Sequence, residues 1–314
     1  MDEIKSVSPV LEIRGLTKYL GNRKILDDIS LKVNPGEIFG FLGPNGSGKT
    51  TTIKLILGLL RIDQGEIDIC GHNVSSDFEK AVRNVGGIIE NPEMYKFLTG
   101  RENLMQYFRM YDDVDKSRID EVVSIVRMEE RIDDKISKYS LGMKQRLGIA
   151  QAILHKPKLL VLDEPTNGLD PAGIKDLRDI FKKLAHEEDC SVFVSSHMLA
   201  ELELMCDRVC VIDRGKIIGD MTMEEIHASK NGDGIKYTLE TDDAEKAACV
   251  AEKMGMKAEK GEGSVEFFAS RDDAASLVAA LVGEGVRIFG LSHASKSLEQ
   301  AFMEITGDNE GGAK

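Results

Sequence analysis

The chain has 314 residues, 42% of them hydrophobic and 30% charged, which is enough for one large and one small domain with hydrophobic cores. Its net charge of −13 argues against nucleic acid as a partner, because phosphate backbones attract lysine and arginine. No segment approaches the ~20 apolar residues that a membrane-spanning helix needs, and residues 1–9 lack the apolar core of a secretion signal, so we expect a cytoplasmic protein. The 5 cysteines have no CxxC spacing, which indicates reduced thiols rather than disulfides or a zinc site.

The first part of the chain predicts strands followed by a helix. Alternating residues at Val10–Gly15 and Ile29–Val33, with a Gly21-Asn22 turn between them, predict an antiparallel pair. The apolar run Glu37–Gly43 predicts a buried strand, and Lys49–Leu60 has helical character. Later segments repeat these patterns, with a helix-rich stretch at about Arg101–Arg131, strands at Lys158–Leu162, Ser191–Ser195, Val209–Ile212 and Lys216–Gly219, and a helix at Ala172–His186.

A domain boundary is predicted near Lys230–Gly234, where lysine, asparagine, glycine and aspartate cluster. Beyond it the order of predicted elements is βαββαβ, the ferredoxin-like arrangement, followed by a last helix at Leu298–Ile305. We therefore expect a domain at 1–229, with a helical subdomain at about 91–140 inserted into it, and a small α+β domain at 230–314.

A phosphate-binding loop lies between the predicted buried strand and the first helix. Gly43-Pro44-Asn45-Gly46-Ser47-Gly48-Lys49-Thr50 matches the pattern G-x-x-x-x-G-K-[ST], and Thr51 follows in the helix. Its glycines let backbone N–H groups point at phosphate oxygens, and the helix start adds its positive dipole end. Lys49 can reach the β- and γ-phosphates, and the Thr50 hydroxyl can ligate Mg²⁺. A glycine-rich turn that only connects two elements is the alternative, but the strand and helix around the loop favour phosphate binding.

The strand at Lys158–Leu162 delivers two acidic residues to the same region. Four apolar residues, Leu159–Leu162, precede Asp163 and Glu164. Asp163 can hold Mg²⁺ directly or through water, and Glu164 can polarise the attacking water. Acidic residues at strand ends are often only solvated, so this assignment depends on the phosphate loop upstream.

These motifs together resemble those of ATP-binding cassette (ABC) ATPases. Tyr139–Arg146, which lies before a predicted helix, resembles the family's signature sequence; Ser140 and Gly142 match it, whereas Leu141 and Met143 depart from its commonest form. In the family, this segment of one subunit closes over the ATP held by another. The resemblance further implies that Gly168–Asp170 is the loop linking two sites, where Asp170 contributes to nucleotide binding. His197 matches the histidine that senses the γ-phosphate.

Two positions depart from the family pattern. The family often stacks an aromatic ring on adenine; either Tyr19 does so, or Leu20 makes an apolar contact, because neighbouring strand residues point to opposite faces. Glu90 stands where most members have a glutamine that touches Mg²⁺ or the water, so we expect it beside the metal and nucleotide; a surface carboxylate without a role is the alternative. Glu90, the Asn91-Pro92 that follows it and the Ser140–Met143 sequence together resemble the subfamily that exports bacitracin and lantibiotic peptides.

The resemblance implies a P-loop α/β fold of the ABC ATPase type with an antiparallel β subdomain, a helical insert and the small C-terminal domain. It implies hydrolysis of ATP with Mg²⁺, with Glu164, His197 and Lys49 as catalytic residues. Two copies would form a homodimer with ATP at the interface and drive an exporter through a transmembrane permease on a separate chain, at the inner face of the cell membrane. A non-transport ABC ATPase and an ATP-sensing regulatory subunit are the alternatives.

Overall fold

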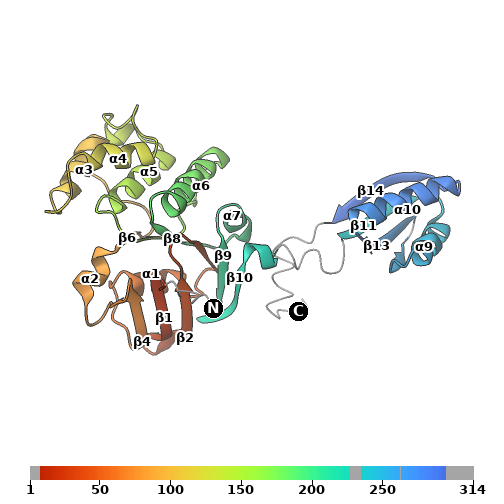
Figure 1. Cartoon of the computed structure of the whole chain (residues 1–314), viewed down its shortest axis with the longest axis horizontal. Helices are drawn as coiled ribbons and strands as arrows, with labels where there is room; N and C mark the ends of the chain where they lie inside the picture. The colour runs from red at the N-terminus through yellow and green to blue at the C-terminus, as the bar shows by residue number, and fades with distance from the viewer. Residues whose placement is uncertain (1–7, 227–234, 262, 295–314) are drawn as a thin grey trace, which may run out of the picture. The chain divides into compact units, whose positions relative to one another are not determined.

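The computed structural model describes residues 8–226, 235–261 and 263–294. They belong to two compact units, Met1–Thr222 and Met223–Lys314 (Figure 1). The division between the units falls slightly before the expected boundary at 229/230. The helix predicted at Leu298–Ile305 lies outside the described residues.

An antiparallel sheet opens the first unit. Its strand order is β2-β1-β4-β5, and the tight turn between β1 and β2 uses Gly21 with φ of 59°. Burial alternates along β2, as the sequence pattern predicts for a strand with one face on the core. The strands are β1 (Leu11–Leu20), β2 (Arg23–Val33), β4 (Gln64–Ile69) and β5 (His72–Asn73).

A mostly parallel sheet forms the centre of the first unit. Its order is β10-β9-β3-β8-β7-β6; β10 is antiparallel to β9, and the other neighbours are parallel. Every residue of β3, β7 and β8 is buried, which explains their continuous apolar runs. The strands are β3 (Ile38–Leu42), β6 (Val85–Ile88), β7 (Leu159–Leu162), β8 (Ser191–Ser196), β9 (Arg208–Asp213) and β10 (Lys216–Thr222).

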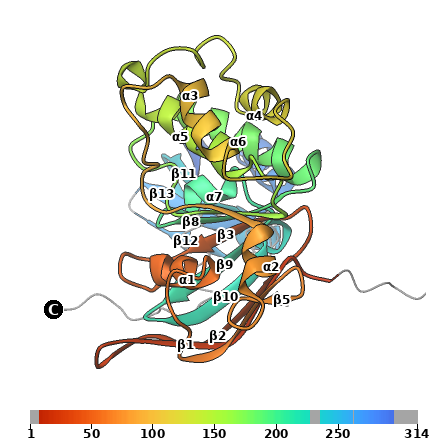
Figure 2. The same ribbon diagram turned by 90° about the vertical axis from the view of Figure 1, so that its left-hand side faces the viewer.

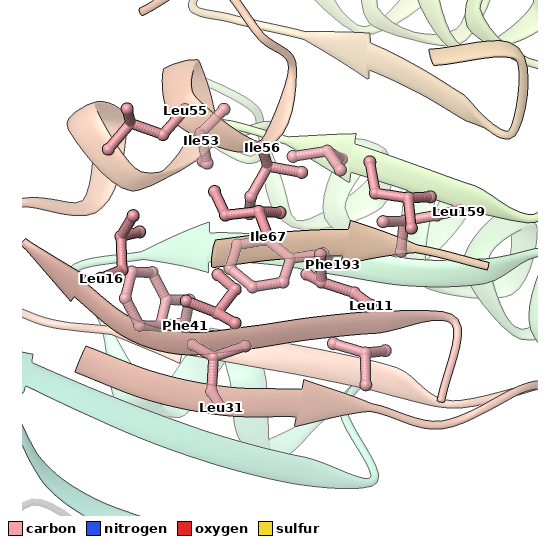
Figure 3. Close-up of a cluster of buried hydrophobic side chains, with 14 of the residues drawn as sticks. Leu11, Leu16, Leu31, Phe41, Ile53, Leu55, Ile56, Ile67, Leu159 and Phe193 are labelled. Atoms are coloured by element: carbon pink, nitrogen blue, oxygen red, sulfur yellow. The ribbon is translucent and has the colours of Figure 1, made fainter. Parts of the chain in front are cut away.

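One hydrophobic cluster joins the two sheets through helix α1 (Lys49–Ile56). Figure 3 shows Ile53, Leu55 and Ile56 of α1 beside side chains from both sheets. Phe193 of β8 is central to the cluster, with its ring centroid 5.4 Å from that of Phe39 and 5.3 Å from that of Phe41. Each such buried side chain contributes roughly 1.5–3 kcal/mol, so this cluster holds α1 against both sheets.

The helical insert lies between β6 and β7 in sequence. Helices α3, α4 and α5 group on the side of the parallel sheet away from β1 and β2 (Figures 1 and 2). Helix α5 packs against α3 and α4 and also against β6 of the central sheet. The helices of the unit not yet bounded are α2 (Phe78–Arg83), α3 (Gly100–Phe108), α4 (Arg118–Ile125), the 3₁₀ turn η1 (Ile136–Lys138), α5 (Leu141–Ala152), α6 (Pro171–His186) and α7 (Leu199–Glu203).

The second unit has the βαββαβ order that the sequence predicts. Its antiparallel sheet has the order β12-β13-β11-β14, and Leu239, Phe267 and Leu277 lie in its core. Asp243 and Ser270 cap the helices Ala244–Lys253 and Arg271–Gly283 through side-chain oxygens. The elements are β11 (Ile235–Thr241), α9 (Ala244–Lys253), β12 (Ala258–Lys260), β13 (Ser264–Ala269), α10 (Arg271–Gly283) and β14 (Ile288–Ala294). Across both units, none of the described helices combines the length and apolarity needed to cross a membrane.

Candidate active site

The loop Gly43–Gly48 connects β3 to α1. Gly46 and Gly48 have φ of 81° and 117°, a region that glycine enters without strain. Gly48 is the N-cap of α1 and offers no side-chain oxygen, so the first N–H groups of α1 are left for a ligand. The hydroxyl of Ser47 is buried and has no hydrogen-bond partner among the residues described. The loop therefore has the unpaired donors that a phosphate chain would occupy.

Gly215, in the turn between β9 and β10, holds the phosphate loop through a backbone hydrogen bond. The N–H of Gly215 donates to Ser47 O over 2.9 Å, and its carbonyl accepts from Asp27 N of β2 at 2.9 Å. A Cβ on Gly215 would lie 2.2 Å from Ile25 O, so this close approach requires glycine. One residue thus joins the phosphate loop, the β9–β10 turn and the antiparallel sheet.

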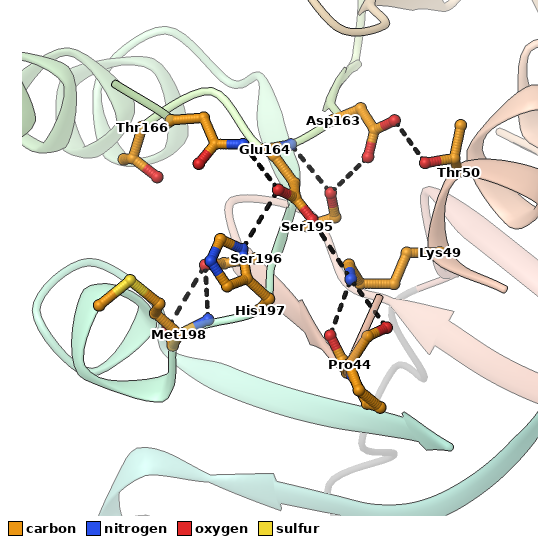
Figure 4. A network of polar contacts seen from close by, with 12 residues as sticks. Pro44, Lys49, Thr50, Asp163, Glu164, Thr166, Ser195, Ser196, His197 and Met198 are labelled. Atoms are coloured by element: carbon orange, nitrogen blue, oxygen red, sulfur yellow. Dashed lines mark hydrogen bonds and ion pairs between the residues drawn. The ribbon is translucent and has the colours of Figure 1, made fainter. Parts of the chain in front are cut away.

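Lys49 is buried at the start of α1 with its ammonium directed along the loop. Its Nζ donates to Gly43 O over 2.7 Å and to Pro44 O over 3.3 Å. The same Nζ lies 3.3 Å from Glu164 Oε1 (Figure 4). The structure thus brings together the lysine and the acidic residue that the sequence places more than a hundred positions apart.

Asp163 follows β7 and accepts two hydroxyl hydrogen bonds. Thr50 Oγ1 donates to its Oδ2 over 2.8 Å, and Ser195 Oγ donates to its Oδ1 over 2.7 Å. Ser195 Oγ also accepts from the N–H of Glu164 at 2.9 Å. The carboxyl ends of β3, β7 and β8 meet at one sheet edge, which brings these residues together. Ser195 is not among the site residues predicted from the sequence; its only signal there is a hydroxyl at the end of an apolar strand.

Glu164 has φ of 47°, a left-handed conformation that is strained for a side chain of this size. Its Oε2 accepts a hydrogen bond from Asn167 Nδ2 over 2.9 Å, and His197 Nδ1 lies 3.2 Å from the same oxygen. With Lys49 on Oε1, both carboxylate oxygens have polar partners (Figure 4). His197 follows β8 directly, at the place in the fold that the sequence predicts.

A pocket of about 370 Å³ is lined by four of the six residues predicted as catalytic or metal-binding, namely Thr50, Glu90, Asp163 and Glu164. Lys49 and His197 are not among the residues that line this pocket. Glu90 has φ of 61° and lies on its wall. The described residues contain no group of three His, Cys, Asp or Glu side chains arranged as a metal site. Three wall residues were not assigned a role from sequence: Asn91, Gln145 of α5 and Asn167. The wall is formed by Thr50, Glu90, Asn91, Gln145, Asp163, Glu164 and Asn167.

Ser140, Gly142 and Asp170 line a different pocket, of about 390 Å³. Ser140 Oγ accepts from Met143 N over 3.2 Å and caps α5, so the signature-like segment continues into the helix instead of only preceding it. Asp170 caps α6 through Oδ1, which accepts from Gly173 N over 2.9 Å. The two pockets share no lining residue.

Several predicted residues line neither of these two pockets, among them Tyr19, Leu20 and Thr51. Tyr19 and Leu20 are 39% and 48% exposed at the end of β1. The ammonium of Lys24 lies 5.8 Å from the centre of the Tyr19 ring. Thr51 is half-buried in the first turn of α1.

All five cysteines are free. Burial raises the pKa of the Cys190 thiol to about 12 and raises that of Cys206 well above its usual value, so both thiols are protonated and unreactive at neutral pH. None of the five cysteines lines either pocket.

The family model described as ABC transporter matches residues 26–167. An uncharacterized ABC transporter ATP-binding protein of Bacillus subtilis, YhcH, is 44% identical over 96% of this chain and 97% of its own length. The bacitracin transport ATP-binding protein BcrA of Bacillus licheniformis is 36% identical over 96% of this chain and 98% of its own. A solved ATP-binding subunit of an ABC transporter superposes with a TM-score of 0.62 at 30% identity, covering 70% of this chain and 92% of that one. The chain therefore belongs to the ATP-binding proteins of ABC transporters and is an ATP-hydrolysing transporter subunit.

Proposed function

We propose that this subunit powers an exporter whose membrane permease is a separate chain, and that its cargo is a peptide antibiotic or another drug. The similarity to a bacitracin transport protein over nearly the whole chain supports this proposal. The subunit would act at the inner face of the cell membrane, held there by its permease.

Within the site, we assign each group by its position. The backbone of Gly43–Gly48, with Lys49 and Thr51, would hold the phosphates. Thr50, Asp163 and Glu90 supply oxygen atoms of the kind that Mg²⁺ prefers, and a bound ion would take its remaining ligands from phosphate and water. Magnesium would neutralise charge on the phosphates. Glu164 would accept the proton of the attacking water, and His197 would hold the γ-phosphate and the Glu164 carboxylate in place.

We further propose that two copies of the chain form a homodimer with ATP at the interface. This proposal is supported by the division of the predicted residues between two pockets. Ser140, Gly142 and Asp170 share no pocket with Thr50 and Asp163 of the same chain. Two copies arranged face to face would bring the signature-like segment of one onto the phosphate loop of the other. ATP at that interface would close the pair, and hydrolysis would open it. Tyr19 or Leu20 would contact the adenine.

A surface near Glu90 suits a membrane partner. A groove of about 280 Å³ runs along Asn91–Met94, Lys96 and Leu141, and the rings of Tyr95 and Phe97 lie beside it in sequence. Tyr95 is 53% exposed and Phe97 70%, with their ring centroids 5.9 Å apart. Two neighbouring exposed aromatic rings are typical of a protein contact. Glu90 lines the pocket of Thr50 and Asp163, which we call the ATP pocket, and Asn91 lines both this pocket and the groove. A permease held here would therefore respond to the state of the nucleotide.

The decisive experiment is a pull-down of the tagged chain from its native cells in mild detergent, with the co-purifying proteins identified. A polytopic membrane protein recovered in matched amount supports the exporter proposal and identifies the permease. Recovery of soluble proteins or ribosomes alone would overturn the exporter proposal.

A further inference from the structure

The carboxylate of Glu201, in the short helix α7, accepts hydrogen bonds from two separate loops of the ATP site. Thr166 Oγ1 donates to Glu201 Oε2 over 2.6 Å. Ser196 Oγ donates to the same oxygen over 2.9 Å. Thr166 lies two residues after Glu164, and Ser196 immediately precedes His197 (Figure 4). A single oxygen atom thus connects the loop of Glu164 to the loop of His197.

The Ser196 hydroxyl also closes the turn that contains His197. It accepts from Met198 N over 3.0 Å while donating to Glu201. Thr166 and Ser196 are both buried, so neither hydroxyl could exchange the carboxylate for bulk water without moving its loop. Removing an acceptor from buried donors leaves them unpaired, which favours rearrangement of the backbone around them.

A simpler role for Glu201 is stabilisation of α7, since acidic residues favour the first turn of a helix. That role would not require two buried hydroxyls to converge on one oxygen. Within the described part of the chain, no lysine, arginine or histidine pairs with Glu201, so the two hydroxyls are its main partners. Hydrogen bonds to an ionised acceptor are shorter and stronger than neutral ones, in agreement with the 2.6 Å distance from Thr166.

We propose that Glu201 is a positioning residue for hydrolysis: it sets the distance between His197 and Glu164 by tying their two loops together. The proposal rests on the roles proposed above for Glu164 and His197. Glu201 itself touches neither the phosphate loop nor the pocket of Thr50 and Asp163. Its loss should therefore slow the chemical step and leave ATP binding nearly intact.

The test is steady-state ATPase kinetics of the full chain with Glu201→Ala and Glu201→Gln, alongside thermal melting. We expect kcat of Glu201→Ala to fall about 10-fold or more, because small misplacements of catalytic groups are costly. Its KM for ATP should stay within about threefold of the wild-type value, because the substitution removes no group that would contact ATP. Glu201→Gln keeps a carbonyl acceptor for both hydroxyls and should restore most of the rate. The matched control is Glu79→Ala, an exposed acidic residue in the first turn of α2, which should leave kcat unchanged.

A second pair of variants keeps the proposal falsifiable if Glu201→Ala melts too low to assay. Thr166→Val removes one hydroxyl at constant shape, whereas Thr166→Ser retains it. We expect loss of rate in the first and near-normal rate in the second. A wild-type kcat in Thr166→Val or Glu201→Ala, with or without a lowered melting temperature, would overturn the positioning role. If Glu164→Gln hydrolyses ATP normally, the proposed role of Glu164 fails; if Glu164→Gln is inactive while Glu201→Ala is normal, only the Glu201 proposal fails.

Discussion

The ammonium of Lys49 lies 3.3 Å from one carboxylate oxygen of Glu164, near the edge of the sheet where β3 and β7 end. Lys49 is almost fully buried, and the Glu164 side chain is 22% exposed. Phosphates that bind to the loop must share Lys49 with this carboxylate. The same negative charge that could activate water therefore also opposes the binding of ATP.

Replacing Glu164 with glutamine should separate these two effects. We expect turnover to fall by about 10²-fold or more, because the amide cannot accept a proton from water. The affinity for ATP should rise, because Lys49 loses a competing anion, and retained ATP should favour dimers. Phosphate release, nucleotide titration and size-exclusion chromatography measure the three effects. Glu187→Gln, an exposed carboxylate at the end of α6, is the control. Undiminished hydrolysis by Glu164→Gln would remove Glu164 from the mechanism.

Lys49→Met should act on binding instead. The variant loses a charged donor to the phosphates and leaves Glu164 without its cation. A charge-assisted hydrogen bond contributes about 1.5–3 kcal/mol, so ATP affinity should fall about 10- to 100-fold. Isothermal titration with ATP measures this, and Lys54→Met in the last turn of the same helix should bind normally. Equal affinities for the two variants would contradict the role of Lys49.

Ser195→Ala should reduce both stability and activity. The fully buried hydroxyl bridges Asp163 Oδ1 and the N–H of Glu164, and its loss leaves both groups without that partner. We expect the free energy of unfolding to drop by about 1–3 kcal/mol. Urea denaturation measures the change, with the exposed Ser124→Ala expected to stay within about 0.5 kcal/mol of wild type. A stable but inactive Ser195→Ala would indicate that the hydroxyl acts on the site alone.

His155 should make the stability of the first unit depend on pH. Burial lowers the pKa of its ring; beyond burial, Val85 O and Asp113 raise it and Arg118 lowers it. Nε2 lies 3.2 Å from Val85 O, and the ring stacks on Tyr111 with centroids 5.0 Å apart. Since the folded pKa lies below the unfolded value of 6.5, the unfolded chain binds the proton first as the pH falls.

Stability should therefore decrease as the pH drops through about 6.5 and level off below the folded pKa, with a slope of at most about 1.4 kcal/mol per pH unit from this group. Melting curves recorded from about pH 8 to about pH 5 measure the decrease, because this range brackets the pKa of free histidine. His155→Gln keeps an N–H donor for Val85 O and should lose part of this pH dependence. An identical pH dependence in the variant would exclude His155 as its source.

The elements that carry long apolar runs could be predicted from sequence, and those that depend on their neighbours could not. The burial of β3, β7 and β8 follows from their composition, and so does the delivery of Asp163 to the sheet edge. By contrast, only Ile67 and Ile69 are buried in β4, so its sequence gives little periodicity, and it forms a strand because β1 pairs with it. The predicted fold and family are confirmed.

The same limit applies to the site. The phosphate loop and the acidic pair follow a local pattern, so their positions along the chain are enough to find them. Ser195 and Glu201 gain their importance from which strands and loops lie next to one another, because each bridges segments distant in sequence. Gln145 lies within the signature-like segment, but the sequence does not place it on the wall of the ATP pocket, because that position depends on how α5 packs.

Gly215 links the phosphate loop to the antiparallel sheet through two backbone hydrogen bonds, one to Ser47 and one from Asp27. Local opening of the sheet at β2 would therefore disturb the loop, and a bound nucleotide would oppose that opening by the free energy of its own binding. In amide hydrogen exchange, ATP should slow the exchange of Asp27 and Gly215, although neither residue lines the ATP pocket. Nucleotide binding would thus protect amides of the antiparallel sheet, a part of the domain that holds none of the proposed catalytic groups.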